Sequence, residues 1–281
     1  MMSAASGPLS AHNRRVTAAR RLVKRGFRET DRAFLAEGPQ TVREALAALA
    51  DQPGAVREIF VGPDARARHT ELLDLAEHSG VPVHHVPAEA LAALCGTVTP
   101  QGIVAVCPFL DVPLSVALEG PPPLVAVLVH VRDPGNAGTV LRSADAAGAG
   151  AVILTDESVD PYNGKCVRAS AGSLFHVPVV AGAPIDEVVA QARAAGLQVL
   201  AADGGGDRDL DEVADSGQLT RPTAWLFGNE AWGLTPQVRA SADAVVRVPI
   251  HGRAESLNLA TAAAVCLYAS ARAMRRAPGV A

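Results

Sequence analysis

The chain has 281 residues, of which 49% are hydrophobic, and a formal net charge of −4 at neutral pH. This length and hydrophobic content suffice for one large domain or two of ordinary size with a sizeable core. Because the chain is mildly acidic overall, a nucleic-acid partner has to be bound by a local basic patch.

The cysteines and the N-terminal residues indicate a cytoplasmic protein. Cys95, Cys107, Cys166 and Cys266 are scattered, with no CxxC pair and no zinc-finger spacing, so we expect free thiols and no metal site. The start, MMSAASGPLSAHNRR, lacks the apolar centre of a signal peptide. No later apolar run reaches membrane-spanning length, so no membrane contact is expected.

A basic segment occupies residues 12–32. It contains Arg14, Arg15, Arg20, Arg21, Lys24, Arg25, Arg28 and Arg32. Five of these recur at helical spacing and would line one face if the segment is a single helix: Arg14, Arg21, Arg25, Arg28 and Arg32. A solvated terminal helix and a phosphate-binding surface both account for this pattern.

Residues 33–108 alternate between strand-like and helical patterns. The strand-like runs are AFLAEG, VREIFVG, VPVHHV and IVAVCP, and between them lie TVREALAALA, HTELLDLAEHSG and AEALAALCG. Such alternation predicts a sheet with helices packed on its faces. Residues 1–107 are therefore assigned to a first domain, which includes the basic segment.

The next segment, PFLDVPLSVALEGPPP, breaks this alternation. Pro121 to Pro123 can continue neither a helix nor a strand and suit a semi-rigid linker. We therefore predict a linker over residues 108–123 and a second domain over residues 124–281.

The second domain begins with LVAVLVHV, a nearly continuous apolar run typical of a strand buried on both faces of a parallel sheet. Further strand-like runs are AVIL, VPVV, LQVLAAD, TAWLFG and AVVRVPI. Helical runs lie between them: AGTVLRSADAAG, GKCVRASAGSLF, PIDEVVAQARAAG and PQVRASA. An Ala-rich helix at about residues 256–276 ends the pattern. The predicted fold is α/β with a parallel sheet.

Three polar clusters follow predicted strands, at the edge where open α/β sheets bind ligands. They are RDPGNAGTVLR, LFGNEAWGLTP and HGRAESLN. Taken singly, each has an ordinary structural explanation: Asn136, Ser256 and Asn258 suit helix caps, and the second cluster suits a long turn. Gly228 and Gly233 in that turn would also let a planar ligand approach the backbone.

Common nucleotide and hydrolase motifs fit poorly. GAGAVI precedes its strand, which is the wrong order for a dinucleotide-binding fingerprint, and the GK at Gly164 lacks the leading glycine of a phosphate loop. RASAG has Arg168 where a nucleophile elbow needs glycine. His130 is expected to be a core or rim residue. Aromatic residues make up only 4% of the chain, which argues against an RNA surface built from stacked rings.

Together, the three clusters resemble the signature motifs of the SpoU (TrmH) family of RNA 2′-O-ribose methyltransferases, part of the SPOUT superfamily. The matching stretches are NAGTVLR, LFGNEAWGL and VPIHGRAESLNLATAAAV, in the family's order and spacing. The resemblance covers residues 124–276 and includes DPYNGKCVRASAGSLFHVPV. Upstream, FLAEGPQTVREAL resembles the α/β/α substrate-binding domain of many members, which is similar to ribosomal protein L30e.

The resemblance implies a deep trefoil knot in the second domain, a homodimer formed through that domain, and S-adenosylmethionine as methyl donor. The implied catalytic residues are Arg142, Asn136, Glu230, Ser256 and Asn258. The implied cofactor-binding residues are Leu226, Gly228, Asn229, Ile250, Ser256, Leu257 and Leu259. For RNA binding we select Arg14, Arg15, Arg21, Arg25, Arg28 and Arg168.

The family assigns Arg142 to activation of the ribose 2′-hydroxyl. A guanidinium is protonated at any ordinary pH and is a poor general base. We therefore expect Arg142 to bind the phosphate beside the target ribose and to stabilise developing alkoxide charge. Arg168 is a second candidate for phosphate binding.

The resemblance leaves the substrate open. Ribosomal RNA, specifically 23S, is favoured because the extra N-terminal domain is present, and a role in antibiotic resistance is compatible with this. Transfer RNA is the alternative substrate. A non-catalytic RNA-binding protein of the same fold is a further alternative, whereas a nicotinamide-dependent dehydrogenase lacks its glycine fingerprint.

Overall fold

The computed structural model describes residues 8–120 and 122–276, so Pro121 of the predicted linker lies outside the described residues. The chain forms two compact units. The first consists of residues 8–110 and 162–175, and the second of residues 111–161 and 176–276. No helix in the described ranges is both long and apolar enough to cross a membrane.

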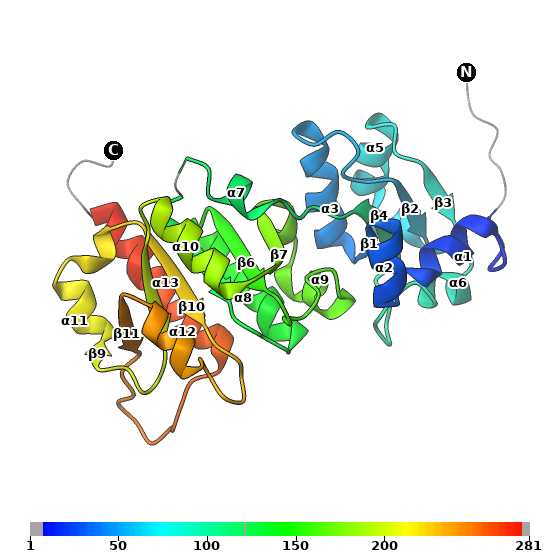
Figure 1. The fold of residues 1–281 in the computed structure, drawn as a ribbon. Helices are drawn as coiled ribbons and strands as arrows, with labels where there is room; N and C mark the ends of the chain where they lie inside the picture. The colour runs from blue at the N-terminus through cyan, green and yellow to red at the C-terminus, as the bar shows by residue number, and fades with distance from the viewer. Residues whose placement is uncertain (1–7, 121, 277–281) are drawn as a thin grey trace. The chain divides into compact units, whose positions relative to one another are not determined.

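The first unit is built on a four-stranded sheet in the order β1-β4-β2-β3 (Figure 1). Its strands are β1 (Ala33–Glu37), β2 (Glu58–Val61), β3 (Val83–His85) and β4 (Ile103–Pro108). Strand β4 pairs antiparallel with β1 and β2, and β3 pairs parallel with β2. The helices between the strands are α3 (Pro39–Ala47), α4 (Ala65–Arg68), α5 (Thr70–His78) and α6 (Ala88–Ala92), with a 3-10 turn η1 (Ala48–Ala50).

The basic segment forms two short helices, α1 (Arg14–Arg21) and α2 (Arg25–Asp31). The predicted single helix with one basic face is therefore wrong. Helix α1 packs its apolar side into the core, and the chain turns after Leu22. At that turn Arg28 is buried and donates to the carbonyl oxygens of Leu22 and Val23 at 2.9 and 2.8 Å. These carbonyls lie at the end of α1, where helix geometry leaves such groups without intrahelical donors.

Residues 162–175 belong to the first unit although strands of the second unit flank them in sequence. They contain α9 (Gly164–Ser170) and the 3-10 turn η2 (Ser173–Phe175). Tyr162 stacks on Phe109 with ring centroids 3.8 Å apart, and its hydroxyl accepts the Leu110 N–H at 2.7 Å. The chain therefore passes between the two units three times, rather than once through a single linker.

The second unit contains a seven-stranded sheet in the order β7-β6-β5-β10-β8-β11-β9. Its strands are β5 (Leu124–Leu128), β6 (Ala151–Thr155), β7 (Val179–Ala183), β8 (Gln198–Ala202), β9 (Arg208–Asp209), β10 (Thr223–Phe227) and β11 (Ala244–Arg247). Each neighbouring pair is parallel, which confirms the predicted parallel α/β fold.

Helices cover both faces of this sheet (Figure 1). They are α7 (Leu114–Ala117), α8 (Pro134–Ala147), α10 (Ile185–Ala194), α11 (Leu210–Asp215), α12 (Pro236–Ser241) and α13 (Leu259–Arg276), with the 3-10 turn η3 (Gln218–Thr220). Alternate residues of β5, such as Val125 and Val127, share a buried cluster with Val188 of α10. On the other face, the Trp225 indole N–H donates to the Ser270 hydroxyl of α13 at 2.9 Å. The sheet is thus buried on both sides, as its apolar strands require.

Two parts of the second unit differ from the local patterns in the sequence. Helix α7 falls within the predicted linker, where Leu114 and Leu118 are buried in the core of this unit. The polar stretch after β8 contains β9 and α11, which begins with a capping box between Asp209 and Glu212. These three short elements were missed because they contain fewer residues than periodicity needs for detection.

Candidate functional site

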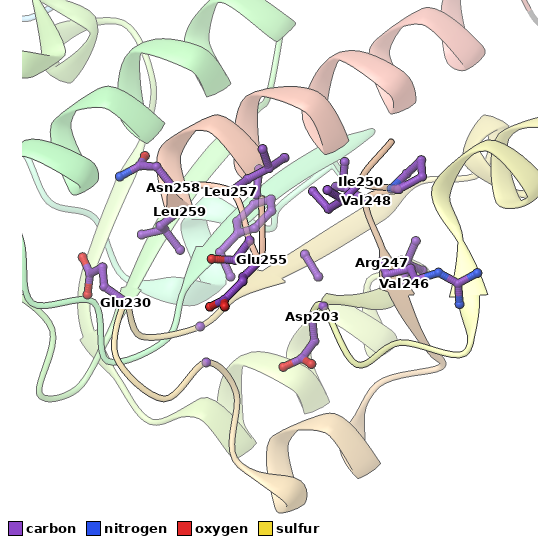
Figure 2. A pocket seen from close by; sticks show the side chains of 18 of the residues that line it. Asp203, Glu230, Val246, Arg247, Val248, Ile250, Glu255, Leu257, Asn258 and Leu259 are labelled. Carbon is purple, nitrogen blue, oxygen red and sulfur yellow. The ribbon is translucent and has the colours of Figure 1, made fainter. Parts of the chain in front are cut away.

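A pocket of about 920 Å³ lies in the second unit where β8, β10 and β11 end (Figure 2). Its walls come from three loops and from Asn136 near the start of α8. The loops contribute residues 203–204 after β8, residues 228–230 and 233 after β10, and residues 248–251 and 255–258 after β11. Residues of the adjoining strands and of α13 complete the lining: Ala202, Asp209, Phe227, Val246, Arg247, Leu259 and Ala262. This is the sheet edge at which the sequence predicted ligand binding.

Three side chains from the three predicted clusters form one hydrogen-bonded chain. The Asn136 amide donates to Glu230 Oε1 at 3.1 Å. The Asn258 amide in turn donates to Asn136 Oδ1 at 3.1 Å. These residues are far apart in the sequence, yet the structure brings all three together at the pocket wall.

The same residues organise the starts of two helices. Asp133 caps α8 by accepting the Asn136 N–H at 2.8 Å, so Asn136 lies inside the helix and is not its cap. Asn258 does cap α13, because its side-chain oxygen accepts the N–H groups of Ala260 and Thr261 at 2.9 and 3.3 Å. The two side chains are thus held by their helices while they bond to each other.

Glu230 is the acceptor at the centre of this arrangement. Besides the Asn136 amide, its carboxylate accepts the backbone N–H groups of Arg132 at 3.2 Å and Asp133 at 3.1 Å. Partial burial raises the pKa of Glu230, but hydrogen bonds from Asn136 and from backbone N–H groups outweigh it and hold the pKa below its ordinary value. The carboxylate is therefore ionised at neutral pH.

Glu230 lies in a closed loop. Asn229 and Gly233 pair across it, with N–H to O distances of 3.0 and 2.8 Å, and Gly233 has φ +67°. The Asn229 side chain donates to the His130 carbonyl at 2.7 Å and accepts the Ala231 N–H at 2.8 Å. A Cβ on Gly228 would lie 2.3 Å from the Gly233 carbonyl carbon, so this close approach requires glycine.

Comparison with known proteins decides the family. Residues 123–268 match the model of the SpoU rRNA Methylase family, and residues 35–113 match that of RNA 2′-O ribose methyltransferase substrate binding. The chain belongs to the SpoU rRNA methylase family. The predicted family and methyltransferase class are confirmed.

Among the SpoU relatives is the 23S rRNA (guanosine(2553)-2′-O)-methyltransferase RlmP of Bacillus subtilis. It is 35% identical over 92% of this chain and 96% of its own length. The AdoMet-bound rRNA methyltransferase from Sinorhizobium meliloti is 31% identical, with a TM-score of 0.79 over 95% of this chain and 97% of its own. The SpoU methyltransferase AviRb from Streptomyces viridochromogenes, in complex with AdoMet, is 28% identical with a TM-score of 0.79, over 94% and 99% of the two chains.

The SpoU pocket has the chemistry to hold S-adenosylmethionine. Four carboxylates line it, those of Asp203, Asp209, Glu230 and Glu255, against one guanidinium, that of Arg247. Arg247 lies 3.5 Å from Asp209, and Arg239 lies 3.6 Å from Asp203. Glu230 and Glu255 are therefore the two lining carboxylates that have no cationic partner within the described residues. Apolar side chains suited to an adenine ring also line the pocket: Phe227 at the end of β10, and Val246, Val248, Ile250, Leu257 and Leu259, which are labelled in Figure 2.

Six of the seven expected cofactor residues line this pocket: Gly228, Asn229, Ile250, Ser256, Leu257 and Leu259. Leu226 does not line it, because its side chain is fully buried in the core of the sheet. Sequence reasoning missed Asp203, Gly204 and Arg247. For Asp203 and Gly204 the available signal was the polar DGGGDRD stretch after a strand, at the edge where such sheets bind ligands. Arg247 stands within the apolar run AVVRVPI, which gives no such signal.

Arg142 lies on α8 but does not line the pocket. Its side chain is exposed, and within the described residues it has no hydrogen bond or ion pair. Ser256, also expected to be catalytic, lines the pocket and is exposed. Asn136, Glu230 and Asn258 are therefore the expected catalytic residues that the structure joins directly.

The selected RNA-binding arginines have different environments. Arg14 is exposed, whereas Arg15 pairs with Glu58 at 3.2 Å and Arg25 pairs with Glu29 at 2.7 Å. Arg21 covers the Phe27 ring at 4.0 Å. The Arg25–Glu29 pair is exposed on both sides and contributes little to stability, whereas only 16% of the Glu58 side chain is exposed. Arg28 is buried and bonded to carbonyl oxygens, so it is a structural residue.

Arg168 is also engaged within the first unit. Its guanidinium lies 2.8 Å from Glu37 Oε2, and only 6% of the Glu37 side chain is exposed. Glu37 further accepts the Gly96 N–H at 3.0 Å and the Thr97 hydroxyl. Burial, followed by the Glu37 charge, raises the pKa of the neighbouring Cys95 thiol to about 12. Arg168 thus neutralises the buried Glu37 carboxylate, and its guanidinium is not free to bind an RNA phosphate.

Proposed function

We propose that this SpoU family member transfers a methyl group from S-adenosylmethionine to a ribose 2′-hydroxyl of ribosomal RNA, specifically 23S. The observation that carries the proposal is the hydrogen-bonded chain of Glu230, Asn136 and Asn258 beside the pocket. It joins the three family motifs into one site. The name of RlmP supports the same reaction and substrate, that of the Sinorhizobium meliloti enzyme supports ribosomal RNA as substrate, and the AdoMet-bound AviRb structure supports the methyl donor.

When bound, S-adenosylmethionine supplies an electrophilic methyl group. The lining residues of the three loops would hold it, with the carboxylates of Glu230 and Glu255 facing positive charge. Apolar residues such as Ile250 and Leu257 would exclude water from the reacting atoms. Because Glu230 is held by three donors, the loop keeps its shape before any ligand arrives.

Arg142 is proposed to act on the RNA. The side chain is exposed and has no partner in the described part of the chain, so its guanidinium is free to bind a phosphate beside the target ribose. From that position it would stabilise negative charge on the 2′-oxygen as its proton leaves. Ser256, exposed at the pocket, is proposed to assist in arranging the ribose.

The first unit is proposed to select the RNA. It contains the residues matching the substrate-binding family model, and α1 and α2 expose Arg14, Arg15, Arg21 and Arg25. Phosphate contacts of this type supply affinity without reading sequence. We propose that the protein acts in the cytoplasm on ribosomal RNA.

Two further expectations belong to this proposal. One is a homodimer formed through the second unit, for which α13 offers exposed Val265 and Tyr268. The other is the trefoil knot of the second unit. Support for the knot comes from the SpoU fold shared with the AviRb structure.

The test combines calorimetric titration with S-adenosylmethionine and incubation with radiolabelled donor and separate pools of ribosomal and transfer RNA. We expect saturable binding, label in 23S RNA, and resistance of the modified linkage to alkali, which identifies a 2′-O-methyl group. If label enters transfer RNA alone, the substrate is transfer RNA and the proposal of ribosomal RNA is wrong. Absence of cofactor binding would leave a non-catalytic RNA-binding protein.

A further inference from the structure

The two tryptophans of the chain have opposite environments. Trp225 is fully buried in β10, where its indole N–H bonds to Ser270. The side chain of Trp232, seven residues later, is 57% exposed. Within the described residues its ring has no aromatic or cationic partner and its N–H no hydrogen bond. An exposed indole without a partner is suited to binding a ligand through its face.

The backbone presents Trp232 on a firmly held loop. Asn229 and Gly233 close the loop with two backbone hydrogen bonds, and the Asn229 side chain ties it to the His130 carbonyl. Glu230 adds contacts to the start of α8. Because the loop is held in this way, a ligand that binds the ring need not order the backbone beneath it, which lowers the entropic cost of binding.

The position of this loop identifies the ligand. Glu230 and Gly233, on either side of Trp232, line the pocket, whereas Trp232 does not. A cofactor inside the pocket therefore leaves the indole uncovered. A ribose that receives the methyl group must approach the pocket from outside, and its base or a neighbouring base then passes the pocket edge. Arg132 lies nearby, with its backbone N–H bonded to Glu230 and its exposed guanidinium paired with the exposed Glu157 at 3.3 Å.

We propose that Trp232 stacks on a nucleobase of the substrate RNA and thereby positions the nucleotide at the pocket. The inference rests on the proposed function and adds a residue that contacts RNA beside the cofactor site. Proteins recognise unpaired RNA bases by stacking them on aromatic side chains, which have access to the face of every base. One such ring is sufficient here, in contrast to the multi-ring surface that the low aromatic content argued against.

The experiment compares full-length wild-type protein with Trp232→Ala, Trp232→Phe and the control Val116→Ala, a half-exposed residue of the same unit outside the pocket. Titration with a 23S RNA fragment gives the Kd for RNA, and calorimetry gives the Kd for S-adenosylmethionine. We expect Trp232→Ala to weaken RNA binding by about tenfold or more, since stacking contributes on that order per base. Trp232→Phe should retain most of the affinity, and Val116→Ala all of it.

Indole fluorescence supplies a readout independent of methyl transfer. RNA should quench wild-type emission, and Trp232→Phe, in which only buried Trp225 emits, should lose that response. Unchanged RNA affinity in Trp232→Ala would overturn the proposal. So would weaker S-adenosylmethionine binding, which would assign the ring to the cofactor, or a changed oligomeric state, which would assign it to a protein interface. If the wild type binds RNA and cofactor but methylates nothing, the proposed function fails, while quenching still tests the stacking.

Discussion

The Asn258 amide lies 3.1 Å from the Asn136 side-chain oxygen and connects the starts of two helices that are 122 residues apart in sequence. The Asn136 amide in turn donates a hydrogen bond to Glu230, so one hydrogen-bonded chain joins all three motifs. Helix α13 packs against α8, which keeps the two asparagines in register. The geometry of the pocket therefore depends on packing between helices that follow different strands.

Arg142→Ala should reduce methyl transfer by about 10²–10³-fold, because it removes a charged group that stabilises the transition state. Binding of S-adenosylmethionine should stay within about twofold, since Arg142 does not line the pocket. Single-turnover methylation and calorimetry measure the two quantities. Arg142→Lys should recover only part of the rate, because ammonium lacks the planar fork that binds phosphate. Equal loss of transfer and cofactor binding would remove this role from Arg142.

Glu230→Gln should lower the melting temperature at pH 7 by about 2 °C, a modest effect because the side chain is largely exposed. The pKa of Glu230 is lowered in the folded protein, so its stabilising effect is full above the ordinary value of 4.5. That effect is lost as the pH falls through the lowered pKa. The difference between wild type and variant should therefore shrink below pH 4.5, as thermal melts across pH would show. A constant difference would mean that the charge of Glu230 does not hold the loop.

Gly228→Ala should lower the free energy of unfolding by about 1–3 kcal/mol, because the added Cβ collides with backbone atoms that cannot retreat. Gly204→Ala is the matched control for stability: Gly204 lines the same pocket, but its Cβ would meet no atom within 4 Å. Urea unfolding of both variants measures the effect. Equal free energies of unfolding for Gly228→Ala and Gly204→Ala would show that the backbone around Gly233 moves away from the added Cβ without loss of stability.

Arg168→Ala should lower the free energy of unfolding by about 3–5 kcal/mol, since it leaves the buried Glu37 carboxylate without its cation. Arg14→Ala, at an exposed arginine of the same unit, should change it by less than about 0.5 kcal/mol. Denaturant titration of each full-length variant separates the two expectations. If Arg168→Ala is as stable as wild type but binds RNA poorly, Arg168 is a phosphate-binding residue after all.

Local pattern predicted much of the second unit. Apolar runs and helical periods located its main strands and helices, because burial on both faces of a parallel sheet leaves a continuous apolar signal. The expected final helix began three residues early, since Ser256 and Asn258 both suit a cap and only Asn258 acts as one. The short elements β9 and α11 left no periodic signal.

The sequence by itself determined the family motifs and the parallel sheet, and it named as site residues nine of the 22 residues that line the pocket, because each of these depends on residues close together in the chain. Only the tertiary structure decided which polar groups meet. Arg168 pairs with Glu37, 131 residues away, and Arg28 turns inward to carbonyls at the end of α1. An arginine at a helical position gives the same sequence pattern whether its side chain faces solvent, a phosphate or a buried carboxylate. Its partner is chosen when the chain packs, since burying a charge is tolerated only where packing supplies an opposite charge or hydrogen-bonding groups.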